Sequence, residues 1–196
     1  MNWLLFAIVA WVLFGLDLGL APQLAPGMGQ VRPSFVIPLL VYVAMHAPPR
    51  SALWAALVLG VLTDLANLTV THAANTGDTI AVLGPSALGY LLAAQLVVAL
   101  RSVVLAKNVL TPIILNLLAA AAIGVVVVAV FTLRSFYPDP IQWRPAPRLL
   151  AAGGTALYTA ALAIPITILL HLLSPWFAFT SAQHQQPLSH ARAFKR

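Results

Sequence analysis

Apolar residues along this chain form six runs that are separated by segments rich in proline, glycine, threonine or arginine. A transmembrane helix needs about 20 mainly apolar residues, and the runs predict spans at 2–21, 35–45, 51–70, 83–101, 109–133 and 149–173. The run at 35–45 is short for a crossing, so we expect a short, tilted or locally broken span. The segments at 71–80 and 134–148 are polar enough for loops. No internal repeat is evident.

The composition indicates that these helices belong to a membrane protein. Hydrophobic residues make up 61% of the 196 residues, charged residues only 7%, and the mean hydropathy is +0.95. Such a chain has too little polar surface to cover a water-soluble globule. We therefore expect an all-α integral membrane protein, with one domain at 1–180 and a polar, basic tail at 181–196.

Charge and cysteine content narrow the function classes. The formal charge of +6 comes from loops and the tail, which in a membrane protein indicates topology and contact with anionic lipid and does not favour nucleic-acid binding. The absence of cysteine excludes disulfides, thiolate catalysis and cysteine-ligated metal. Six spans place both termini on one side, and the distribution of arginine and lysine leans toward a cytoplasmic location for them.

Two helical runs carry small residues beside an acid. In the run at 51–68, Ala52, Ala56, Gly60 and Asp64 recur every four residues and therefore share one helix face. Small residues let another backbone approach closely. The first run also combines small residues with an acid, because Gly15 and Gly19 flank Asp17. We interpret these seven residues as helix-packing or partner-binding positions.

The two acids leave three interpretations open. An acid inside a membrane span is costly and usually faces a partner or a cavity. Asp17 and Asp64 could bond a helix end or a loop amide, could contact a partner or second subunit, or could couple proton or ion movement.

Motifs for catalysis are missing from the sequence. It has no HExxH, no GxSxG, no phosphate-binding glycine loop and no histidine pair at ligand spacing. The five histidines are isolated, near predicted helix ends or in the tail, and are read as interfacial or solvated. We therefore expect a protein that is not an enzyme and that uses no cofactor or metal.

One known family shares several short motifs with the first half of the chain. They are Arg32-Pro33-Ser34-Phe35, then LLVYVAMH, then GVLTDL, and then LGPSALGYLLAAQLVVALR, which ends at Arg101. This stretch resembles the rod shape-determining protein MreD family, in which a basic-Pro-Asp-apolar start is followed by a G-x-x-x-D-apolar span and a Gly-rich fourth span ending in Arg. Beyond residues 32–101, the resemblance rests on length and span count.

The resemblance implies a six-helix bundle similar to the substrate-binding subunits of energy-coupling-factor vitamin transporters. It also implies a non-catalytic scaffold of the bacterial cell-elongation machinery in the cytoplasmic (inner) membrane, one that helps maintain rod shape and direct peptidoglycan synthesis. The implied partners are the bitopic protein MreC, the filament protein MreB, and RodA with penicillin-binding protein 2. A second copy of the chain is another possible partner for the small-residue faces.

The alternative is a small-molecule binding subunit of a transporter, with a vitamin-like ligand in the bundle. Its pocket residues would be Asp64, Asn116 and Tyr90, because pockets of this kind combine apolar walls with a few polar groups. The polar segment 71–79 is its candidate lid.

Overall fold

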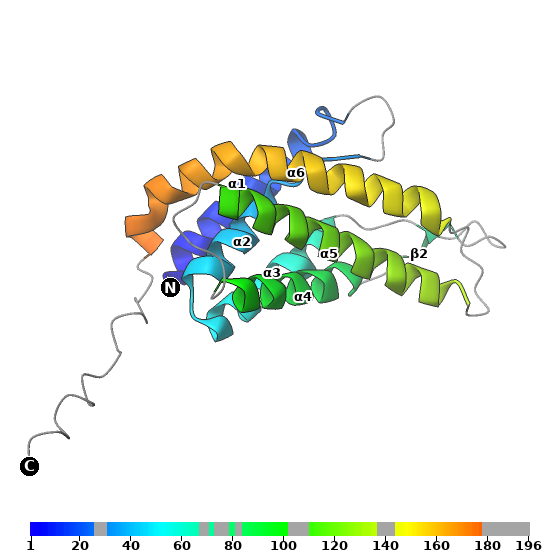
Figure 1. Ribbon diagram of the computed structural model, residues 1–196, viewed down its shortest axis with the longest axis horizontal. Helices are drawn as coiled ribbons and strands as arrows, with labels where there is room; N and C mark the ends of the chain where they lie inside the picture. The colour runs from blue at the N-terminus through cyan, green and yellow to red at the C-terminus, as the bar shows by residue number, and fades with distance from the viewer. Residues whose placement is uncertain are drawn as a thin grey trace, which may run out of the picture.

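The computed structural model describes residues 1–25, 31–66, 71–72, 79–80, 84–101, 110–136 and 144–177. Within these ranges the chain forms six α-helices, one short 3-10 helix and two strands of two residues (Figure 1). The tail at 181–196 and the centre of the candidate lid, 73–78, lie outside the described residues. The bounds are α1 Trp3–Gly19, α2 Val36–His46, α3 Pro49–Ala66, β1 Thr71–His72, β2 Thr79–Ile80, α4 Pro85–Leu100, α5 Leu110–Arg134, α6 Pro145–Leu173 and η1 Ser174–Phe177.

The helices coincide with the six predicted runs and differ from them at their ends. The third helix begins two residues earlier than expected and ends at Ala66, and α6 begins at Pro145, inside the predicted loop. Proline is tolerated at the first helical position because its missing N–H needs no partner there. The expected loop at 71–80 is corrected in part, because Thr71 pairs with Ile80 in an antiparallel bridge.

Helices α3, α4, α5 and α6 pack in sequence order, each against the next, and α2 contacts all four of them (Figure 1). Helix α1 packs on α2 and on η1. The backbone N–H of Asn2 donates to the carbonyl of Phe177 at 3.0 Å, so the start of α1 and the end of α6 lie at the same end of the bundle.

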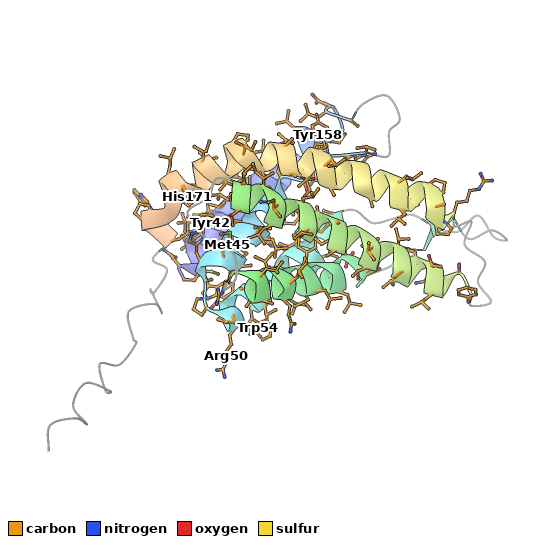
Figure 2. All side chains as sticks on the ribbon, viewed as in Figure 1. Tyr42, Met45, Arg50, Trp54, Tyr158 and His171 are labelled. Carbon is orange, nitrogen blue, oxygen red and sulfur yellow. The ribbon has the colours of Figure 1, made fainter. Side chains whose placement is uncertain are left out.

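Three of the helices, α3, α5 and α6, are long and apolar enough to cross a membrane, which is compatible with a helical membrane protein. Helices α1, α2 and α4 are apolar but shorter. Figure 2 shows Arg50 and Trp54, near the start of α3, projecting from the bundle. Arginine and tryptophan side chains of this kind are typical of a membrane interface. Six complete crossings stay a prediction.

Helix α2 is the buried centre of this arrangement. Nine of its eleven residues are buried, and a helix of that length extends only about 16 Å, roughly half the thickness of a bilayer's hydrocarbon core. The expectation of a short second helix is therefore correct. Its ends lie among other helices, where the backbone groups at each end need partners from the protein itself.

Arg101, which follows the last residue of α4, supplies those partners at the C-terminal end of α2. Its Nη1 donates to the carbonyl of Ala44 at 3.0 Å and to the carbonyl of Ala47 at 2.7 Å. A cation at this position also interacts favourably with the partial negative charge of a helix C-terminus.

The small-residue stripe of α3 is occupied by α4. Ala52 and Ala56 are fully buried, and a Cβ added to Gly60 would lie 2.5 Å from the Cα of Ala87. Real Cβ atoms do not approach a backbone that closely, so only glycine permits this contact. The glycines of α1 differ, because a Cβ at Gly15 or at Gly19 would meet no atom within 4 Å.

Replacing Gly60 with leucine should therefore destabilise the bundle by about 3 kcal/mol or more, because the α4 backbone must move to admit the side chain. The matched change Gly15→Leu should leave stability within about 0.5 kcal/mol of the parent. Unfolding of the two purified variants in detergent, followed by circular dichroism, checks this difference. Equal stabilities would contradict the close packing of α3 on α4.

Candidate functional site

Asp64 lies near the end of α3 and caps the start of α4. Its carboxylate accepts hydrogen bonds from the backbone N–H groups of Gly84, Ser86 and Ala87, at 2.9, 3.0 and 3.2 Å. These amides are among those that a helix start leaves without an intrahelical partner, and the negative charge matches the positive end of the helix dipole. The side chain is 5% exposed. Of the three open interpretations, the contact with loop amides is the one that this geometry displays.

Asp17 makes the equivalent contact at the start of α2. Its carboxylate accepts a hydrogen bond from the N–H of Phe35 at 2.6 Å and another from the hydroxyl of Ser34 at 3.2 Å. The N–H of Ser34 in turn donates to Thr159 of α6 at 3.0 Å. The start of α2 is thus fastened to both α1 and α6.

The two capping units repeat the same pattern. In each unit an aspartate near the end of one helix bonds the start of the next, where Pro-Ser precedes or opens the helix: Pro33-Ser34 after Asp17, and Pro85-Ser86 after Asp64. The pattern is hard to detect in the sequence, because only three residues match and the two segments between them differ in length.

Tyr90 lies on α4, three residues after Ala87, whose N–H bonds Asp64. The ring is 2% exposed. Of the three predicted pocket residues, Asp64 therefore caps α4, and Tyr90 is a buried residue of the same helix.

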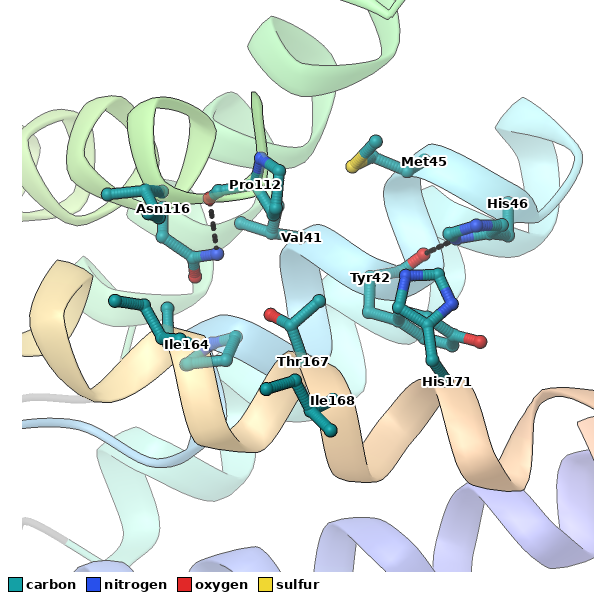
Figure 3. Close-up of a pocket in the computed structure, with 13 residues that line it drawn as sticks. Val41, Tyr42, Met45, His46, Pro112, Asn116, Ile164, Thr167, Ile168 and His171 are labelled. Atoms are coloured by element: carbon teal, nitrogen blue, oxygen red, sulfur yellow. Dashed lines mark hydrogen bonds between the residues drawn. The ribbon is translucent and has the colours of Figure 1, made fainter. Parts of the chain in front are cut away.

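Asn116, the third predicted pocket residue, does line a cavity. The cavity has a volume of about 260 Å³ and lies between α2, α5 and α6 (Figure 3). Neither Asp64 nor Tyr90 is among the residues that line it, which are Pro38, Val41, Tyr42, Met45, His46, Pro112, Ile113, Asn116, Ala163, Ile164, Thr167, Ile168 and His171.

Three rings meet at one end of this cavity. The ring centroid of Tyr42 lies 4.5 Å from that of His46 and 5.4 Å from that of His171, and the two histidine rings are 5.7 Å apart. His46 Nδ1 donates to the carbonyl of Tyr42 at 2.9 Å. The sequence carries no signal for this cluster, because His46 ends α2 and His171 lies in α6, with three helices between them in the chain. The described residues contain no group of three or more possible metal ligands.

A second hollow, an apolar groove of about 550 Å³, separates α1 from α3. We call it the α1–α3 groove. Its residues are apolar throughout: Trp3, Phe6, Ala7, Ala10, Trp11, Phe14, Leu18, Val58, Leu62, Leu65 and Ala66. The predicted small-residue stripe at 52–64 lies on another face of α3, against α4, whereas Gly15 and Gly19 are exposed on α1.

If the acids serve as caps, Asp64→Leu should destabilise the protein more than Asp17→Leu. The first change leaves three backbone N–H groups without an acceptor and the second leaves one. Each buried unpaired group costs about 1–3 kcal/mol. Asp64→Asn should give an intermediate loss, because an amide keeps only one accepting oxygen. Thermal unfolding in detergent gives the order. A fully stable Asp64→Leu variant would exclude the capping role.

Comparisons with protein-family models, with curated proteins and with solved structures find no match for this chain.

Proposed function

We propose that this chain is a non-catalytic membrane scaffold that docks the single transmembrane helix of a partner protein in the α1–α3 groove. The observation that carries the proposal is the groove itself, because it lies between two helices and presents only apolar side chains. Helix association within a membrane depends on close van der Waals packing, which a concave apolar surface of this kind favours.

The exposed face of α1 has the spacing of a helix-packing surface. Leu4, Ile8, Trp11, Gly15 and Leu18 follow one another at intervals of four, three, four and three residues, and all are exposed. This is the spacing of the seam between two helices that cross at a small angle. The large residues lie toward the start of α1, and the glycines toward its end allow a partner backbone to approach closely.

The other wall of the groove continues this surface. On α3, Val58, Leu62 and Leu65 are 41%, 40% and 50% exposed, and they line the same groove as Trp11 and Leu18. A helix lying there would contact α1 and α3 together, which would bury more surface than contact with either helix alone.

The acids and the resemblance support a scaffold over an enzyme. Asp17 and Asp64, the two acids within the described residues, bond helix starts. The motifs at 32–101 that resemble the MreD family point to the elongation machinery of rod-shaped bacteria. In this proposal the bundle crosses the inner membrane six times with both termini in the cytoplasm, and its arrangement is similar to vitamin-transporter binding subunits. The docked helix is that of MreC, while MreB, RodA and penicillin-binding protein 2 belong to the same assembly.

Filling the groove should release the partner. Val58→Trp places a large side chain in the groove, and we expect at least a tenfold loss of co-purified MreC. Val125→Trp is the matched control, because Val125 is 54% exposed on α5 and is not a groove residue; it should leave recovery unchanged. Equal recovery with both variants, measured by quantitative immunoblotting after gentle extraction, would exclude this surface.

Crosslinking distinguishes a partner helix from lipid or a second copy. The chain contains no cysteine, so a single cysteine at Leu62 reports on the groove and one at Leu118 of α5 serves as the control. We expect a heterodimer band with a cysteine in the MreC span from the Leu62 position alone. A band at the mass of two copies would contradict a partner helix and indicate a homodimer. The absence of a band from either position would indicate that lipid fills the groove.

A further inference from the structure

The cavity between α2, α5 and α6 contains a buried polar atom that lacks a hydrogen-bond partner among the described residues. This atom is Oδ1 of Asn116, in a side chain that is 1% exposed. The Nδ2 of the same amide donates to the carbonyl of Pro112 at 2.7 Å, which fixes the orientation of the amide. A buried acceptor without a donor costs about 1–3 kcal/mol, so a ligand that brings a donor gains by satisfying it.

The lining of the cavity indicates the rest of the ligand. Apart from Asn116 and Thr167, the walls near the amide are aliphatic, and Figure 3 shows the amide on the side of the cavity that faces Ile164 and Thr167. The rings of Tyr42, His46 and His171 and the thioether of Met45 lie at the other end. Aromatic rings and methionine sulfur both pack favourably against another aromatic ring.

Size and access are consistent with such a molecule. The volume of about 260 Å³ exceeds that of an engineered apolar cavity of about 150 Å³ that takes up benzene. Ile164 and Ile168 line the cavity and are also 44% and 60% exposed on α6, one of the helices long enough to cross the membrane. The cavity therefore opens toward the face that lipid covers.

We propose that this cavity binds a planar aromatic molecule that carries one O–H or N–H donor and enters from the bilayer. The ring lies against the Tyr42, His46 and His171 cluster, and the donor bonds Oδ1 of Asn116. A membrane quinol headgroup and a free lipid-soluble aromatic alcohol or indole share this chemistry. The site is separate from the α1–α3 groove, so ligand binding and helix docking can be tested and can fail independently.

A matched pair of probes tests the donor. 2-Naphthol and 2-methylnaphthalene have similar shapes, but only the first has a hydroxyl group. Equilibrium dialysis against the full chain in lipid nanodiscs, corrected with empty nanodiscs, should give at least tenfold tighter binding of 2-naphthol, which corresponds to about 1.4 kcal/mol. Equal affinities, or binding no greater than that of empty nanodiscs, would overturn the proposal.

Two variants locate the site. Asn116→Leu should reduce the preference for 2-naphthol to less than twofold; leucine suits a helix interior, so α5 should still form. The control Gln95→Leu also removes an amide, at an exposed position on α4 that does not line the cavity, and should keep the full preference. A full preference in Asn116→Leu would overturn the proposal. If Asn116→Leu does not fold, Ile168→Trp provides a second test, because its side chain should obstruct the exposed mouth of the cavity. This variant should lower 2-naphthol affinity at least tenfold, and an unchanged affinity would overturn the proposal.

Mass spectrometry of solvent extracts from the purified protein distinguishes the sources. A quinol enriched over the surrounding lipid identifies a membrane headgroup, and an enriched small aromatic alcohol or indole identifies a free ligand. Both outcomes support the proposal if Asn116→Leu abolishes the enrichment. The site would be excluded if the extract matches bulk lipid and probe binding does not depend on Asn116. Water would then be the remaining hydrogen-bond donor for the amide oxygen.

Discussion

The structure depends on one constraint, which is that short helices ending inside a bundle must have their terminal backbone groups satisfied by other parts of the chain. Water is not available in the hydrocarbon region, and each unsatisfied group is costly. Helix α2 meets this requirement with Asp17 of α1 at its start and Arg101 after α4 at its end. Asp64 does the same for α4. Opposite charges at opposite ends match the helix dipole, so the same contacts stabilise the bundle electrostatically.

This constraint also determines where function can lie. The carboxylates of Asp17 and Asp64 are bonded to helix starts, so capping is the role that their contacts show. Two surfaces of the described residues that the bundle does not use for its own packing are the α1–α3 groove and the cavity beside Asn116. In our two proposals the groove docks a helix and the cavity binds a small molecule, so the scaffold and the ligand site are separate.

Individual residues illustrate how far sequence reasoning reached. Gly60 was identified by its spacing from Ala56 and Asp64, and the spacing does place these residues on one face. Which neighbour covers that face could not be derived, because small residues pack equally well against the same chain and a partner, and here α4 covers it. Asn116 was a candidate pocket residue because of its polarity. Asp64 and Tyr90 are polar as well, but neither lines the cavity, and the contacts of Asp64 show that it caps α4.

The sequence by itself determined the helical membrane class, the approximate limits of the helices and the short second helix, because these depend on local hydrophobicity and on run length. Tertiary structure decided the contacts between distant segments. It brought Asp17 to Phe35, Arg101 to Ala44, and His46 to His171. The physical reason is that capping and cavity formation depend on where helix ends meet in space. Local sequence patterns do not encode that position, since residues far apart in the chain must satisfy the same buried group.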